Sequence, residues 1–389
     1  MKNPKIPVLY SLLKIHKDIK NPPGRPIVSG INSISCNISE YVDKILQKYV
    51  VSLPSYLKDS TQVIRDLQKV QLKQGTFLCT LDVKSLYTSI QHELGIRAVS
   101  HYLEKDHDMP TNQKEFIIEA ISYILNHNYF WFEDRYYLQI WGTAMGTRFA
   151  PSYANLFLGH WEQQNITPKL GGDLVLWRSF IDDIVFLWQG SEVEMLKFVN
   201  DINKNDQNLE LTSTYSQETI NFLDLEIRKN KNSDFLDFKT YFKKVDVCNY
   251  VLSTSNHNPT WLKNIPYGQF CRLKKNCSNP IELENQLNHV SERFKQRGYK
   301  NKLIQKARKQ LTKIDRTDLL KEKMKKQITN KQLGLSFITS YTPGAQEIKR
   351  ILNRHWNILE EDELLKGKIP QKPKVIYKRA NNLSQMMSA

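Results

Sequence analysis

The sequence lacks a pattern of paired cysteines. Its five cysteines, an odd number without any CxxC pair, are Cys36, Cys79, Cys248, Cys271 and Cys277. This argues against a disulfide framework or a zinc site and predicts a reducing, intracellular environment. The sequence also lacks an apolar run of about 18 residues, and its first residues lack the apolar stretch of a signal peptide. We therefore expect a soluble protein without a membrane partner.

Carboxylates are scarce in one part of the chain. Residues 272–331 contain 18 Lys and Arg against 6 Asp and Glu, so this segment carries +12 of the total charge of +16. A basic segment attached to a nearly neutral body indicates binding to a polyanion, most simply nucleic acid. The alternative is a solubilising helical surface. At 389 residues and 40% hydrophobic composition, the chain is long enough for two or three folded lobes.

Two adjacent aspartates interrupt an otherwise apolar stretch, LVLWRSFIDDIVFLW. The β-branched and aromatic arms of this stretch, Leu174 to Trp188, predict a β-hairpin with Asp182 and Asp183 at its turn. Neighbouring carboxylates near an apolar core repel each other, and a divalent cation commonly neutralises them. The alternative is an exposed turn that uses aspartate as a turn former. A third carboxylate on another strand favours the metal site.

Asp82 supplies this third carboxylate near the end of the strand-like run 77–83. Taken alone, such an aspartate can simply cap the following turn, and Tyr87, five residues later, can simply pack against the sheet. Towards the N-terminus, Lys14 and Arg25 lie on two short apolar segments joined by a turn at NPPG. Cations on such a hairpin can bind a triphosphate, although exposed cations on edge strands also serve solubility.

The remaining segments alternate between strand and helix patterns. We predict helices over 39–49, 61–72, 94–103, 114–126, 192–204 and 344–359, and single strands over LELTSTYS, INFLDLEIRK and FLDFKTYFKK. A hairpin surrounds Glu133-Asp134, and an amphipathic helix opens at Ala150-Pro151 after Gly142 and Gly146. Glycines before a helix permit close approach of a nucleic acid, but also occur in plain connections. The order β-α-β-β-α-β predicts a ferredoxin-like sheet.

Taken together, LLKIHK, RPIVSG, LDVKSLYTSI, QIWGTAMGTRFAPSYANLF, FIDDIV, INFLDLEI, IPYGQFCRL and SYTPGAQEIKRILNRHW resemble a reverse transcriptase. The resemblance is closest to the Penelope-like retroelement branch, whose polymerases are similar to telomerase. It implies an RNA-directed DNA polymerase with an α+β right-hand fold. The expected parts are partial fingers over 1–74, a palm over 75–257 with a helical insert at about 91–128, a basic helical thumb over 258–335, and a helical extension with a loosely ordered tail over 336–389.

The resemblance also implies roles for individual residues. It assigns catalysis and the binding of two Mg²⁺ ions, replaceable by Mn²⁺, to Asp82, Asp182 and Asp183. The implied substrate-binding residues are Arg25 and Lys14 for the triphosphate of the dNTP, Tyr87 as a steric gate against ribonucleotides, and Gln139 and Gly146 for the template and nascent base pair. The thumb is expected to hold the hybrid of RNA template and DNA primer through its phosphates.

Some positions depart from the pattern of this family. Phe180 stands where many relatives have Tyr, Met145 replaces a common Gln, and LELTSTYS provides no lysine to act as a general acid. The usual N-terminal region and a GIY…YIG endonuclease motif are absent from this sequence, so we expect no endonuclease domain. The basic stretch KEKMKKQ suggests nuclear import. The competing hypotheses are a truncated, non-catalytic nucleic-acid-binding remnant of a retroelement and a polymerase of another palm family.

Overall fold

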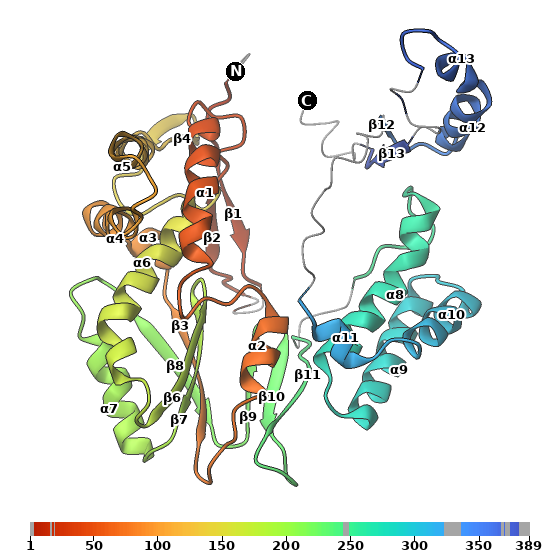
Figure 1. Cartoon of the computed structure of the whole chain (residues 1–389). Coiled ribbons are helices and arrows are strands. Elements are labelled where there is room, and N and C mark those ends of the chain that lie inside the picture. Colours follow the sequence, from red (N-terminus) through yellow and green to blue (C-terminus); the bar gives the residue numbers. More distant parts are fainter. Residues whose placement is uncertain are drawn as a thin grey trace. The chain divides into compact units, whose positions relative to one another are not determined.

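The computed structural model describes residues 4–15, 18, 20–243, 249–322, 336–366, 369 and 374–380. The chain forms two compact units, Met1–Val245 and Asp246–Ala389, coloured red to green and green to blue in Figure 1. The predicted boundary between palm and thumb, at 257/258, stays a prediction. Within the described ranges, no helix has the length and apolarity needed to cross a membrane.

A four-stranded antiparallel sheet forms the centre of the first unit. Its strands are β3 (Phe77–Val83), β6 (Leu174–Phe180), β7 (Asp183–Trp188) and β8 (Leu211–Ser216), in the order β6-β7-β3-β8. Helices separate β3 from β6, and another helix separates β7 from β8, so the sheet has the predicted β-α-β-β-α-β order. The central strands β3 and β7 are almost entirely apolar because both of their faces are covered.

The first unit also contains helices, of which α6 and α7 lie along one face of this sheet (Figure 1). They are α1 (Cys36–Val50), α2 (Ser60–Leu67), α3 (Leu86–Ser89), α4 (His92–Glu104), α5 (Thr111–Asn126), α6 (Ala150–Asn165), α7 (Glu192–Asn203) and the short 3₁₀ helix η1 (Thr167–Lys169). The prediction of an amphipathic α6 is wrong. It buries Ser152, Leu158 and Glu162 as well as Tyr153, Leu156 and Phe157 of the expected apolar face, because α1, α4 and the sheet surround it.

Three smaller sheets complete the first unit. Two are hairpins, β1 (Leu9–Leu13) with β2 (Gly24–Val28) and β4 (Tyr129–Phe132) with β5 (Arg135–Leu138); the third has the order β11 (Leu236–Thr240), β10 (Leu225–Lys229) and β9 (Thr219–Phe222). The sequence predicted one strand over INFLDLEIRK. This is wrong, because Leu223 adopts a φ of 54° and reverses the chain between β9 and β10.

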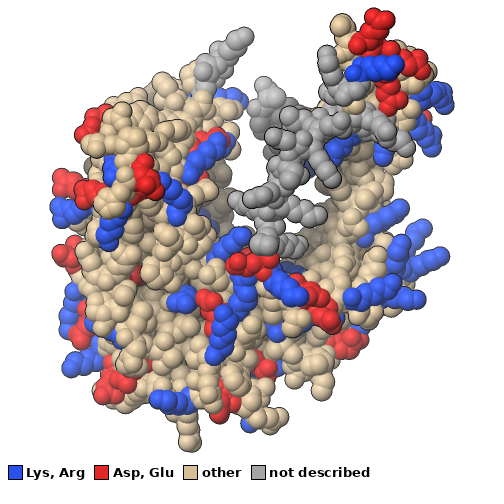
Figure 2. Space-filling view, viewed as in Figure 1, with Lys and Arg blue, Asp and Glu red and all other residues tan. Residues whose placement is uncertain are grey.

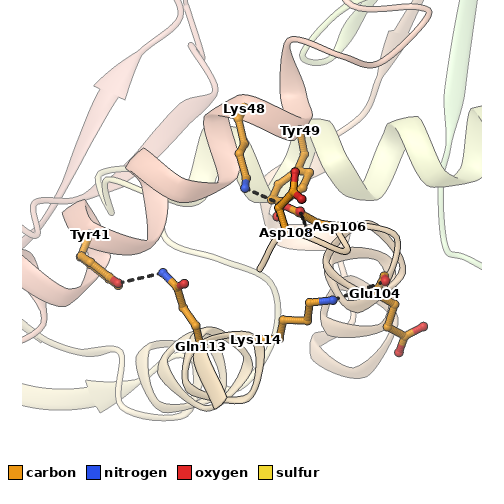
Figure 3. Close-up of polar contacts among 8 residues, drawn as sticks. All are labelled: Tyr41, Lys48, Tyr49, Glu104, Asp106, Asp108, Gln113 and Lys114. Carbon is orange, nitrogen blue, oxygen red and sulfur yellow. Dashed lines mark hydrogen bonds and ion pairs between the residues drawn. The ribbon is translucent and has the colours of Figure 1, made fainter. Parts of the chain in front are cut away.

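Asp106 joins the helical insert to α1. This carboxylate, in the connection between α4 and α5, accepts hydrogen bonds from Lys48 Nζ at 2.5 Å and from the Tyr49 hydroxyl at 2.7 Å (Figure 3). Lys48, Tyr49 and the main-chain N–H of Asp108 lower the pKa of Asp106 to about 2. The insert is therefore held against α1 by charge-assisted hydrogen bonds to Asp106 as well as by apolar packing.

The second unit contains α8 (Pro259–Asn276), α9 (Pro280–Gln296), α10 (Asn301–Leu311) and α11 (Arg316–Leu320), packed around Phe270, Val290 and Phe294. It continues with β12 (Ser336–Ser340), α12 (Ala345–His355), α13 (Asn357–Glu360) and β13 (Lys374–Lys378). A loosely ordered tail was predicted from residue 365. For 374–378 this is wrong, because β13 pairs in parallel with β12.

Candidate functional site

The three predicted aspartates lie at one end of the central sheet. Asp82 on β3 and Asp183 on β7 are direct partners across the two strands. Asp182 precedes Asp183, and its main-chain oxygen accepts a hydrogen bond from Val83 N at 2.9 Å. Asp82 and Asp183, 101 positions apart in the sequence, thus share one edge because β3 and β7 pair in register.

The turn of the aspartate hairpin differs from the prediction by one residue. Asp183 is already in β7 and pairs with Phe180 on β6, so the turn consists of Ile181 and Asp182. Ile181 has a φ of 56°, a conformation that a β-branched residue rarely adopts, and its side chain packs against the core. Strained backbone of this kind concentrates at functional sites. The turn therefore fixes the main chain that carries both aspartates.

Burial and mutual repulsion disfavour the charged forms of Asp182 and Asp183. Burial raises the pKa of Asp183 to about 6, with further contributions from Asp182 and Asp82, while Lys243 acts in the opposite direction. Burial, and then Asp82, also raise the pKa of Asp182, which Arg25 and Lys14 oppose. A bound cation would remove this repulsion, and carboxylate oxygens are the ligands that Mg²⁺ prefers.

The side chains are not gathered as ligands around one ion. Within the described ranges, no three His, Cys, Asp or Glu side chains form a group that could hold a metal by themselves. The carboxylate oxygens of Asp82, Asp182 and Asp183 suit a divalent cation. Binding of such ions at this site stays a proposal.

Arg25, Lys14 and Tyr87 come from separate segments and act on the same aspartate. Arg25 lies on β2, and Lys14 follows β1, where its N–H donates to Pro23 O at 2.9 Å. Both cations stabilise the charged form of Asp182. Tyr87, on α3, is half-buried. Burial, and to a lesser extent the charge of Asp182, raise the pKa of Tyr87 to about 12, whereas Arg25 lowers it. The fold thus places two cations and a phenol around the aspartate hairpin.

Gly146 approaches the protein's own strand β2. A Cβ on Gly146, which has a φ of 134°, would lie 2.2 Å from Val28 O, and Val28 N donates to Met145 O at 2.9 Å. The sequence left two interpretations of this glycine open, close approach of a nucleic acid and a plain connection. Its close neighbour within the chain is the strand that carries Arg25, and its role beside the template and nascent base pair stays a prediction.

Gln139 uses its side-chain amide within its own loop. Its Nε2 donates to Trp141 O at 2.8 Å, and its Oε1 accepts from Asn128 Nδ2 at 2.7 Å. It also lines a cavity of about 400 Å³ with Pro26, Met145 and other residues of the β1–β2 and β4–β5 hairpins. Gln139 therefore shapes the wall of this cavity, beside the strand that carries Arg25. A larger hollow of about 640 Å³ belongs to the second unit and contains none of the predicted site residues.

Sequence reasoning missed two residues that bear on this site. Lys243 follows β11 and acts electrostatically on Asp183; the lysine pair at the end of FKTYFKK was its only signal. Glu162 on α6 is buried and accepts hydrogen bonds from Ser55 Oγ, Ser179 Oγ at 3.3 Å and Trp177 Nε1 at 2.7 Å. It fixes β6 just before the aspartate turn. In the sequence, the only indication of this role was a single carboxylate in the largely apolar segment LFLGHWEQQ.

Solved structures with a similar fold are polymerases. Telomerase from Candida albicans, in complex with a TWJ fragment of telomeric RNA, matches 80% of this chain with 11% identity and a TM-score of 0.55. The apo telomerase of Candida tropicalis matches 81% with 12% identity and a TM-score of 0.49, and an RNA polymerase complex of a dsRNA virus matches 69% with 12% and 0.49. The chain has a polymerase fold like that of the Candida albicans telomerase.

The matches cover only part of the similar proteins. The chain spans 56% of the Candida albicans telomerase, 59% of the Candida tropicalis telomerase and 25% of the viral polymerase chain. A family model described as an animal helix-turn-helix domain matches residues 249–309. No curated protein matches the sequence.

Proposed function

We propose that the protein is an RNA-directed DNA polymerase that extends a primer 3′-hydroxyl with deoxynucleotides. The observation that carries this proposal is the direct pairing of Asp82 with Asp183, beside Asp182, on the central sheet of a polymerase fold. Nucleotidyl transfer needs carboxylates from two strands at one point, together with cations for the triphosphate. The first unit provides both kinds of residue.

Each residue has a distinct part in this proposal. Asp82 and Asp182 hold two Mg²⁺ ions, with Asp183 as a weaker ligand. When bound, such ions activate the attacking hydroxyl and stabilise the leaving pyrophosphate. Arg25 binds the triphosphate bidentately and Lys14 as a point charge. Tyr87 places its ring where a ribose 2′-hydroxyl would lie, and the wall that includes Gln139 supports the template.

We further propose that the chain derives from a retroelement of the Penelope-like branch. The order of the motifs from RPIVSG to IPYGQFCRL supports this origin, as does the likeness of its fold to a telomerase. On this proposal, the nucleic-acid partners are an RNA template, a DNA primer and their hybrid.

Primer extension tests the proposal. The full chain with an RNA template, a DNA primer, dNTPs and Mg²⁺ should extend the primer, and Asp182→Ala should lower the rate by at least about 1000-fold. Asp173→Ala is the matched control, because Asp173 is an exposed aspartate of the same unit and precedes Leu174, which pairs with Trp188 at the opposite end of the sheet. Equal extension by wild type and Asp182→Ala would refute the assignment. Extension with NTPs instead of dNTPs would favour a different class of polymerase.

A further inference from the structure

The segment from Arg293 to Ile314 contains nine Lys and Arg residues and no Asp or Glu. It comprises the end of α9, the following turn and all of α10. Lysines spaced three or four positions apart on a helix repel one another. Solubilising helices relieve this repulsion by alternating Glu with Lys, and α10 has no acidic residue with which to do so. A polyanion offers the missing counter-charge.

Four of these cations form a row along α10 and the turn after it. Lys302, Lys306, Lys309 and Lys313 are spaced by four, three and four residues, which places them within an arc of about 60° on a helix. All four are exposed, and in the part of the chain that the structure describes none makes a side-chain hydrogen bond or ion pair. Figure 2 shows Lys and Arg side chains gathered over this region. We call these four residues the α10 lysine row.

The opposite face of α10 is anchored in the second unit. Ile304, Ala307 and Leu311 are buried there. Arg308, beside this face, forms an ion pair with Glu284 on α9. The helix therefore presents its lysine row outward from a fixed position, so little conformational entropy would be lost when a ligand binds.

The connection between α9 and α10 has the form of a helix-turn-helix. Four residues, 297–300, join the helices, and Gly298 among them has a φ of 81°. The turn is held by hydrogen bonds from Arg297 Nε to Tyr250 O at 2.7 Å and from the Tyr299 hydroxyl to Val251 O at 3.0 Å. The match to a helix-turn-helix family model covers this turn and most of α10.

We propose that α10 is a docking helix for double-helical DNA, with the α10 lysine row on the backbone phosphates. In a helix-turn-helix the second helix enters the major groove. The major groove of B-form DNA, about 12 Å wide, admits a helix, whereas the deep, narrow groove of an A-form duplex does not. An RNA duplex or an RNA–DNA hybrid is therefore disfavoured as the occupant. The inference does not rest on polymerase activity.

Fluorescence anisotropy of the full chain with a labelled, blunt DNA duplex of about 20 base pairs tests the proposal. The variant Lys302→Gln/Lys306→Gln/Lys309→Gln/Lys313→Gln should bind about 100- to 1000-fold more weakly near 0.15 M salt. The slope of log K against log salt should also become shallower by about 3 to 4, because four phosphate contacts are lost. Replacing the same lysines by Arg should restore the affinity and the slope.

A charge-matched control uses exposed lysines of the first unit. Lys58→Gln/Lys69→Gln/Lys73→Gln/Lys197→Gln removes the same four charges and should leave the slope almost unchanged. An equal loss in both quadruple variants would overturn the proposal, because net charge alone would then explain binding. Unchanged binding by the α10 variant, with a thermal melt that matches wild type, would also overturn it. So would a loss confined to an RNA–DNA hybrid of the same length.

Asp182→Ala separates this inference from the proposed polymerase. The variant should bind the blunt DNA duplex as tightly as wild type even where primer extension is lost. Loss of duplex binding in Asp182→Ala, in a protein whose melt is unchanged, would count against α10 as the docking element. Absence of primer extension in wild type would refute the polymerase and leave the duplex-binding result to stand by itself.

Discussion

Asp82 and Asp183 face each other because β3 and β7 pair from Phe77 to Asp82 without a bulge. A shift of one residue in this register would move every side chain of one strand to the other face of the sheet. Apolar side chains pack on both faces of these strands against different neighbours, so such a shift would disrupt the close packing on both faces. The position of the carboxylates is thus fixed by hydrophobic residues that take no part in chemistry.

Tyr87 is the residue at which sugar selectivity can be tested. Tyr87→Ala should raise the efficiency of ribonucleotide incorporation relative to dNTPs by about 10- to 100-fold, because the ring no longer occupies the space of the 2′-hydroxyl. Tyr87→Phe keeps the ring and should still reject ribonucleotides. Single-nucleotide extension with paired dNTP and NTP substrates measures the ratio. A Tyr87→Ala variant as selective as wild type would exclude the gate role.

Gly146 controls the contact between β2 and the loop before α6. Gly146→Ala should destabilise the protein by on the order of 3 kcal/mol, because it combines a strained φ with a clash against Val28 O. Gly172→Ala is the control, since a Cβ there meets no atom within 4 Å. Urea unfolding of the two variants gives the comparison. Similar unfolding midpoints for both would contradict the proposed contact.

At the scale of elements, α6 acts as the support of the aspartate hairpin. Glu162 ties this helix to Ser179 and Trp177 on β6 and to Ser55 in the segment before α2. Main-chain hydrogen bonds join the same segment to β6. Ser179 N donates to Ser55 O, and Leu57 N donates to Ser179 O, both at 2.8 Å. The strand that enters the turn at Ile181 is thereby held on both sides.

Glu162 should make stability depend on pH. Burial raises its pKa above the usual 4.5, with the three hydrogen bonds opposing. The stability that Glu162 contributes is therefore complete below about pH 4.5 and is lost as pH rises through the raised value. Urea unfolding of wild type and Glu162→Gln from pH 4 to pH 8 tests this. The difference in unfolding free energy should shift in favour of the glutamine variant as pH rises.

A pH-independent difference between Glu162→Gln and wild type would contradict this account. The Glu162→Ala variant measures what the three hydrogen bonds to Glu162 contribute to the free energy of unfolding. It should cost on the order of 3 kcal/mol at pH 4, because three buried donors lose their acceptor, and less as pH rises and wild type loses stability.

At the scale of the whole molecule, charge is segregated between the two units. Residues 1–245 contain 28 Lys and Arg and 28 Asp and Glu, a net charge of zero. Residues 246–389 contain 28 against 12, a net charge of +16 that equals the charge of the entire chain. On the proposed function, long-range attraction of nucleic acid would come from the second unit, whereas the first unit has cations and carboxylates close together at the aspartate hairpin.

The sequence by itself determined the central sheet and the candidate site residues. Alternating and continuous apolar runs specify strands β3, β6 and β7, and aspartates inside such runs stand out because an unpaired buried carboxylate is costly. The motifs in order then indicated a polymerase, and the fold agrees at that level.

Only the tertiary structure decided which residues meet. Pairing of Asp82 with Asp183, the action of Lys243 on Asp183 and the tie at Glu162 join residues distant in the chain. Turns within apolar segments, at Leu223 and Ile181, were missed or misplaced because neither residue signals a positive φ. Helix faces such as that of α6 depend on how many neighbours cover them, and that number is set by packing, which local patterns do not encode.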